Sequence, residues 1–143
     1  MRLHRLALVP ATGALALLLA TSPAAAGGRP LSADLTGAAE APGPGDPDGR
    51  GTARITVNPG LGEICYQLKV SGIAPATAAH IHEAPAGEAG PVLVALAAPT
   101  NGSSSGCVAV SREDAKDLLK NSSDYYVNVH NAEFPRGALR GQL

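Results

Sequence analysis

The sequence predicts an all-β fold, a Greek-key-like β-sandwich of about eight short strands with one short helix before the penultimate strand. Short runs that are apolar, or that alternate apolar and polar residues, recur from residue 31 to the end of the chain. Turn-forming residues separate these runs, and the chain contains 17 Gly and 12 Pro. Only one segment, around residue 115, has the spacing of an amphipathic helix.

The first half of the chain supplies a hairpin and two further strands. Residues 52–57 alternate polar and apolar side chains and end at the turn Asn58-Pro59-Gly60, so they are expected to pair with residues 63–70. Residues 42–51 are rich in Gly and Pro and are expected to form a loop. The expected strands are residues 31–37, 52–57, 63–70 and 78–83.

The second half supplies the remaining strands and the helix. Ser111 is suited to cap a helix, Glu113 and Asp114 favour its first turn, and residues 115–119 carry an apolar stripe. Residues 99–106 are expected to be a flexible loop. The expected strands are residues 91–96, 107–110, 125–130 and 138–143.

Residues 1–26 have the features of a signal peptide. A basic start over residues 1–5 precedes an apolar stretch over residues 6–20, and Ala24-Ala25-Ala26 offers the small residues of a cleavage site. The apolar stretch is short and interrupted, which does not suit a membrane span, although an uncleaved anchor is the alternative. We therefore expect a secreted or cell-surface protein whose mature single domain is residues 27–143.

The composition argues against nucleic acid as a partner. The formal net charge is −1 and aromatic residues make up 3% of the chain. Nucleic-acid surfaces need clustered basic residues and stacking side chains, and the sequence shows neither. We likewise expect no membrane span after signal cleavage.

Cys65 and Cys107 are expected to form a disulfide. An exported protein with two cysteines most simply makes one bridge. Both cysteines have the opposite parity to the main apolar residues of their strands, which suits a cross-strand link on an outer face. The alternative is that both are metal ligands, although no CxxC spacing supports it.

His80, His82 and His130 are the candidate metal ligands. His80 and His82 point to one face of an expected strand, and His130 ends a second strand. If the strands pair, three imidazoles share one surface, as a Zn or Cu site requires. The candidates for supporting contacts are Glu83, Tyr126, Asn128 and Arg140, although Glu83 has the wrong parity for a regular strand.

Two other interpretations of these histidines stay open. They could form a polar network with Asn128 and nearby loop backbone that fixes strand register without any ion. They could also serve as catalytic acids or bases, although no catalytic residue is predicted.

Several segments, in their order along the chain, resemble a CHRD (chordin-type) domain. Each segment is short, but together they cover about residues 31–143. The segments are Leu35-Thr36-Gly37-Ala38-Ala39-Glu40-Ala41-Pro42, Gly51-Thr52-Ala53, Ala79-His80-Ile81-His82, Gly90-Pro91-Val92, Tyr126-Val127-Asn128-Val129-His130 and Pro135-Arg136-Gly137-Ala138-Leu139-Arg140-Gly141-Gln142-Leu143.

The CHRD resemblance implies an extracellular all-β domain. The family includes non-enzymatic modules of chordin proteins, which antagonise growth factors, and free-standing secreted bacterial proteins. The chain resembles the free-standing bacterial type, because no cysteine-rich growth-factor-binding repeats accompany the domain. The antagonist activity is therefore not expected here.

A local similarity to Cu/Zn superoxide dismutases gives a second hypothesis. His80-Ile81-His82-Glu83 resembles their copper-ligand strand, and His130 stands where a further copper ligand is expected. The sequence departs from those enzymes because it lacks the additional histidines of their bridging and zinc positions. A local match of this kind is a hypothesis until its structural context is known.

These observations predict a secreted CHRD protein that acts as a non-enzymatic binding or structural module. The sharper hypothesis adds a divalent Cu or Zn ion held by the three histidines, so the expected partner is either a metal ion or an unknown extracellular ligand. The alternatives are a metal-dependent oxidoreductase of the superoxide dismutase type and a protein- or matrix-interaction module without metal.

Overall fold

The computed structural model describes residues 27–143, and the predicted signal peptide lies outside these residues. The all-β prediction is confirmed, because the described chain has eight strands and one α-helix, which precedes the penultimate strand. The elements are β1 (Arg29–Thr36), the 3₁₀ turn η1 (Gly37–Ala39), β2 (Arg50–Asn58), β3 (Glu63–Ser71), β4 (Ala76–Glu83), β5 (Val92–Leu96), β6 (Ser103–Ala109), α1 (Arg112–Lys120), the 3₁₀ turn η2 (Ser122–Asp124), β7 (Tyr125–Asn131) and β8 (Leu139–Gln142).

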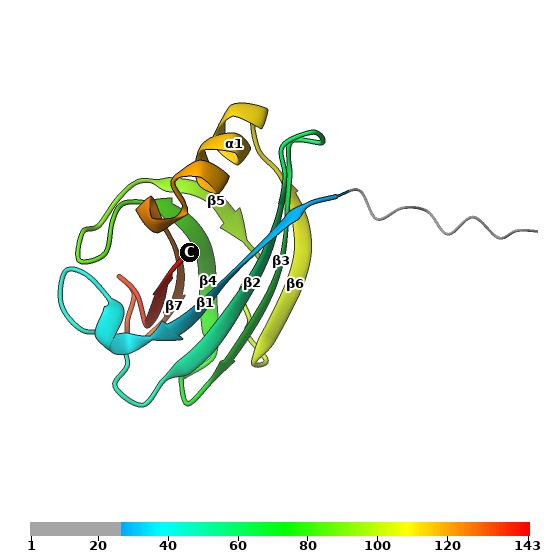
Figure 1. The fold of residues 1–143 in the computed structure, drawn as a ribbon. Coiled ribbons are helices and arrows are strands. Elements are labelled where there is room, and N and C mark those ends of the chain that lie inside the picture. The colour runs from blue at the N-terminus through cyan, green and yellow to red at the C-terminus, as the bar shows by residue number, and fades with distance from the viewer. Residues whose placement is uncertain (1–26) are drawn as a thin grey trace, which may run out of the picture.

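The eight strands form one antiparallel sheet in the order β5-β4-β7-β8-β1-β2-β3-β6. The sheet curls until its two ends approach each other, so the layers expected of a sandwich are halves of one sheet (Figure 1). Side chains join the two ends, since the Tyr66 hydroxyl accepts from the Ala97 N–H at 2.9 Å and Ser104 Oγ donates to the Ala97 carbonyl at 2.7 Å. The sheet is therefore nearly closed.

The core fills the inside of the curled sheet with small and branched side chains. Alternate residues of the strands point inward, as in Ala53, Ile55 and Val57 of β2. Helix α1 lies across one end of the sheet (Figure 1) and buries Ala115 and Leu118. This arrangement leaves the opposite parity of each strand on the outer face.

Two side-chain contacts position α1. The Ser111 hydroxyl accepts from the Asp114 N–H at 2.9 Å, as the predicted N-cap requires. The Tyr125 hydroxyl donates to Asp117 Oδ2 at 2.6 Å and so connects the helix to the start of β7. Burial and this hydrogen bond both raise the pKa of Tyr125, so its hydroxyl stays protonated as the donor.

The expectation of a flexible loop over residues 99–106 is wrong for its second half. β6 begins at Ser103, and Ser103, Ser104 and Ser105 pair with Lys69, Leu68 and Gln67 of β3. Ser and Gly have low strand propensity, but the backbone of an adjacent strand supplies the hydrogen bonds that order them. The predicted hairpin is confirmed, with β2 and β3 paired over their whole length.

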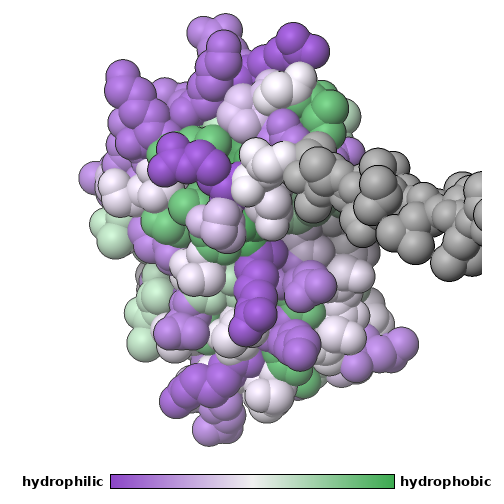
Figure 2. All heavy atoms as spheres, turned by 45° about the vertical axis from the view of Figure 1, so that its right-hand side comes forward, coloured by the Kyte–Doolittle hydropathy of each residue, from purple (hydrophilic) through white to green (hydrophobic). Residues whose placement is uncertain are grey.

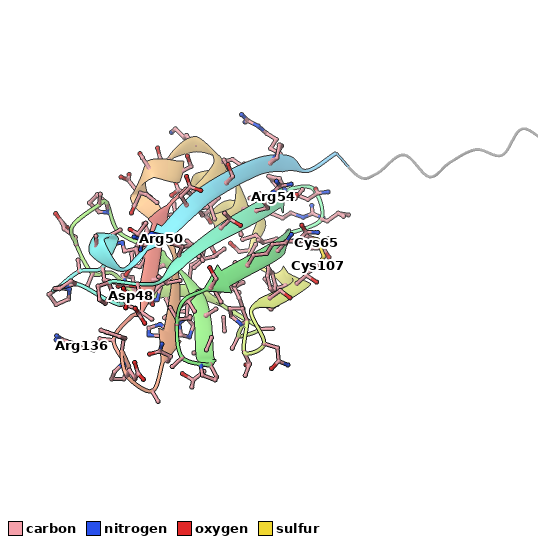
Figure 3. All side chains as sticks on the ribbon, turned by 90° about the horizontal axis from the view of Figure 1, so that it is seen from below. Asp48, Arg50, Arg54, Cys65, Cys107 and Arg136 are labelled. Carbon is pink, nitrogen blue, oxygen red and sulfur yellow. A yellow bond between two sulfur atoms is a disulfide. The ribbon has the colours of Figure 1, made fainter. Side chains whose placement is uncertain are left out.

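The predicted disulfide is also confirmed. Cys65 and Cys107 lie directly opposite each other in β3 and β6 and are covalently bonded. Figure 3 shows the two residues side by side at the edge of the sheet. The bridge ties β6, the last strand of the sheet, to β3 of the adjacent β2–β3 hairpin.

The surface over β1, β2, β3 and β6 is mainly polar. Figure 2 shows hydrophilic and neutral side chains on this side, with hydrophobic ones in small scattered groups. Leu61 and Val92 are the exposed large hydrophobic residues of the described chain. Within residues 27–143, no helix has the length and apolar character needed to cross a bilayer.

Removal of the disulfide by Cys65→Ala together with Cys107→Ala should destabilise the domain. The bridge closes a loop of 42 residues, for which the chain-entropy model gives about 4 kcal/mol. We expect a lower urea midpoint for the double variant than for the oxidised parent. Reductant should lower the midpoint of the parent and leave that of the variant unchanged; equal midpoints for the oxidised parent and the variant would contradict this role.

Candidate functional site

The three histidines outside the first few residues meet on the outer face of β4 and β7. Their neighbours Ala79, Ile81, Val127 and Val129 are buried in the core, so the alternate residues point outward. Each of His80, His82 and His130 offers a ring nitrogen, and these atoms all lie within 4.8 Å of one another. The convergence predicted from strand parity is therefore present.

Backbone carbonyls fix the protonation of two of the rings. His82 Nδ1 lies 3.0 Å from the Gly90 carbonyl oxygen, and His130 Nδ1 lies 3.1 Å from the Pro135 carbonyl oxygen. Because a carbonyl only accepts, both Nδ1 atoms must carry the proton, which leaves each Nε2 with a free lone pair. His80 Nδ1 lies 3.1 Å from His130 Nε2 and donates to it.

His82 Nε2 is a buried nitrogen without a hydrogen-bond partner. It is the one such buried side-chain nitrogen or oxygen among residues 27–143. Buried polar atoms normally find a partner, and leaving one unmet costs about 1–3 kcal/mol. The lone pair of His82 Nε2 is thus available to a donor or a cation.

The electrostatics of the cluster favour neutral imidazoles. Burial lowers the pKa of His80, and the neighbouring His130 and His82 rings lower it further. Burial also lowers the pKa of His130, against the opposing effect of its hydrogen bond to Pro135. Neutral imidazole is the form that binds metal ions.

Three of the four residues predicted around the ligands surround this cluster. The Tyr126 ring stacks on His82, with centroids 4.8 Å apart and planes at 6°. The Arg140 Cζ lies 3.4 Å from the centroid of the Tyr126 ring. Asn128 lies opposite His80 in the sheet, and its amide donates to the Glu40 carboxyl group.

Glu83 is not brought into the cluster. It is exposed at the end of β4, opposite Tyr125, and its charge contributes to the raised pKa of that tyrosine rather than acting on the histidines. The parity of a regular strand explains this placement, since Glu83 shares its face with Ile81.

The sequence interpretation did not identify Glu40 as part of the site. Glu40 lies between η1 and the Pro-rich loop, outside any periodic segment, and it reaches Asn128 across 88 positions of sequence. Its only signal was its place in the segment 35–42 that resembles the CHRD family. The sequence also did not predict the roles of the Gly90 and Pro135 carbonyls. Every residue has a backbone carbonyl, so the residue type does not indicate which one accepts a hydrogen bond.

The carboxyl group of Glu40 has a raised pKa. Burial lifts its pKa from 4.5 to about 7, while the nearby positive charge of Arg140 and the hydrogen bonds from Asn128 and Ala41 oppose the rise. Glu40 thus takes up a proton near neutral pH, beside the Asn128 amide and the Arg140 guanidinium.

Two other features of the surface offer fewer side chains that could bind a metal ion. A shallow hollow of about 860 Å³ lies over β1, β2, β3 and β6, across the row Ser32, Arg54, Gln67 and Ser105, with no imidazole in its lining. Glu63, Cys65 and Cys107 also lie close together, but the disulfide occupies both sulfurs. In Figure 3 the disulfide lies across the molecule from Arg136, which belongs to the loop that contacts His130.

Replacement of Glu40 by Gln should stabilise the protein increasingly as the pH rises. The folded-state pKa of about 7 lies above the ordinary value of 4.5, so stability from this group is present below 4.5 and is lost as the pH rises through 7. Gln keeps an acceptor for Asn128 but carries no charge. The variant should gain on the order of 1 kcal/mol over the parent at pH 8, since solvent screens a half-buried group.

Urea unfolding of both proteins between pH 4.5 and 8 checks this expectation. The difference between the two free energies of unfolding cancels the opposite effect of the histidines, whose lowered pKa values destabilise the fold at acid pH. A difference that does not change with pH would show that Glu40 is ionised without cost.

Of the comparisons with known proteins, the one with protein-family models gives a match. No curated protein and no solved structure is detectably similar to the chain. The family model of the CHRD domain matches residues 31–143, which spans β2 to β8, all but the start of β1, and the histidine cluster. The chain therefore belongs to the CHRD domain family.

Proposed function

We propose that this protein is a non-enzymatic binding module that holds one transition-metal ion through His80, His82 and His130. The observation that carries the proposal is the buried, unpartnered Nε2 of His82, on a ring that has a nitrogen within 4.8 Å of nitrogens of His80 and His130. A buried imidazole lone pair next to two further imidazoles can bind a metal cation.

The distance between two of the rings supports the same conclusion. His80 Nδ1 and His130 Nε2 are 3.1 Å apart. Two nitrogens that each bind one ion at about 2.05 Å, with an angle of 90–110° between the bonds, lie roughly 2.9–3.4 Å apart. The spacing of these rings is thus compatible with two ligands of one ion, and His82 supplies a third imidazole within 4.8 Å.

The donor set favours copper or zinc over harder ions. All three donors are imidazole nitrogens, whereas Ca²⁺ and Mg²⁺ prefer oxygen ligands. At a nitrogen site of this kind Cu²⁺ binds more tightly than Zn²⁺ by the Irving–Williams order. The carbonyls of Gly90 and Pro135 orient two of the rings, as partners of ligating histidines commonly do.

Metal binding through His80 Nδ1 requires one proton to move. That nitrogen carries the proton donated to His130 Nε2, and the lone pairs of both atoms are needed by the ion. The proton therefore transfers to His80 Nε2, and the ion replaces the hydrogen bond that joins the two rings. No proton is lost overall when all three imidazoles begin neutral.

We further propose that the protein is exported, with residues 1–26 as its signal peptide and residues 27–143 as its CHRD domain. The disulfide and the CHRD family are both compatible with an extracellular location. The partner in this proposal is the metal ion, in an oxidising compartment where Cu²⁺ and Zn²⁺ are the stable forms.

Titration of the refolded domain with Cu²⁺ and Zn²⁺, followed by calorimetry and elemental analysis, tests the metal site. We expect one ion per chain for the parent and at least about tenfold weaker binding for His82→Ala, because a ligand is removed. Glu83→Gln is the matched control, since Glu83 is the adjacent residue on the opposite face, and it should bind like the parent.

Equal and weak uptake by the parent and by His82→Ala would remove the proposed site and leave the polar-network interpretation. Turnover of superoxide by the copper-loaded parent, at a rate above that of free copper, would contradict the non-enzymatic assignment. A protein partner that binds equally in the presence of chelator would favour the module without metal.

A further inference from the structure

The loop of residues 84–91 is held against the outer face of the sheet by side chains of β7 and β8. Arg140 donates to the carbonyls of Glu88 at 2.6 Å and Pro85 at 2.9 Å. Gln142 Nε2 donates to the Ala84 carbonyl at 2.7 Å, and the Tyr126 hydroxyl accepts from the Gly90 N–H at 3.3 Å. The loop thus contributes backbone groups at four positions, and the sheet contributes the side chains.

The end of this loop determines the orientation of His82. The Gly90 carbonyl accepts from His82 Nδ1, so the position of the loop selects which ring nitrogen carries the proton. If the Gly90 carbonyl moved away, either nitrogen of His82 would be free to hold the proton or to turn toward the other histidines.

Arg140 acts on the same ring through a stack of planar groups. Its guanidinium lies on one face of Tyr126, and the His82 imidazole lies parallel to the ring of Tyr126. The three residues come from β8, β7 and β4, which are adjacent in the sheet. The ring plane of His82 is therefore held by Tyr126, and the ring plane of Tyr126 is held by Arg140.

The burial of Arg140 indicates a role that a lysine would not serve. Its side chain is 1% exposed, and burying a cation is costly unless its donors are satisfied. A planar guanidinium reaches two carbonyls and stacks on an aromatic ring at once, whereas an ammonium group has no plane that could stack while its donors reach the carbonyls. Arg140 uses both properties, because its guanidinium donates to the Glu88 and Pro85 carbonyls and also lies on the Tyr126 ring.

We propose that Arg140 is a positioning residue for the metal site, which sets the tautomer and ring plane of His82 by holding the loop of residues 84–91 and the Tyr126 ring. The part of this inference that concerns metal affinity rests on the proposed function. Its structural part, the control of His82, is independent of whether a metal binds.

The test uses ¹⁵N-labelled, metal-free protein and a two-bond ¹H–¹⁵N spectrum, which reports the tautomer of each histidine. In the parent, His82 should be a single Nδ1–H tautomer. In Arg140→Lys it should become a mixture, and the affinity for Cu²⁺ should fall about 10–100-fold, as for loss of a supporting partner. Arg136→Lys is the matched control, because Arg136 is exposed, and neither readout should change.

A folded Arg140→Lys variant that keeps a single His82 tautomer would overturn the proposal. If that variant does not fold, Arg140→Gln decides the question, since its amide lacks the fork that reaches the Glu88 and Pro85 carbonyls together. We expect Arg140→Gln to admit a second tautomer, and a single tautomer would overturn the proposal. A parent with the expected tautomer that binds no metal would contradict the proposed function and leave the role of Arg140 intact.

Discussion

The antiparallel pairing of β4 with β7 is the constraint on which the rest of the site depends. Its register sets His80 opposite Asn128 and His82 opposite Tyr126, with Ala79, Ile81, Val127 and Val129 of the same strands in the core. A shift of one residue would exchange the two faces and bury imidazoles inside the curled sheet. The hydrophobic packing of the core therefore also determines which side chains form the outer polar layer.

The outward-pointing polar side chains of β4, β7 and β8 are themselves covered by loops. They are therefore more buried than the side chains on an open sheet surface, and some of their pKa values are shifted. Asn128, Tyr126 and Arg140 are almost fully buried although they point away from the core. Loops of the chain supply the cover, and their carbonyls become the acceptors for His82, His130 and Arg140. Water is excluded from groups that would otherwise be solvated, which strengthens their mutual interactions and shifts the pKa values of His80 and Glu40.

The sequence was informative wherever the period of two applied and uninformative in the loops. Strand parity predicted the outward cysteines of the disulfide and the convergence of the three histidines. It also indicated that Glu83 points to the opposite face from the histidines. It could not predict Glu40, the Gly90 carbonyl or the Pro135 carbonyl, because loops have no periodicity and these groups act across long separations in sequence. Ser103 to Ser105 were missed as a strand for another reason, since the pairing partner rather than local propensity orders them.

The polar-network and metal interpretations of the histidines differ in one physical respect. A polar network is stable when each of its buried members is satisfied, and a partly satisfied network is less stable than an apolar layer. Arg140, Gln142, Asn128 and Tyr126 all have partners here, and so do the Nδ1 atoms of His82 and His130. Among the buried side-chain atoms of residues 27–143, the remaining unmatched one is Nε2 of His82, a member of the imidazole cluster. The proposed cation would satisfy this lone pair, whereas the polar-network interpretation needs a hydrogen-bond donor at the same atom.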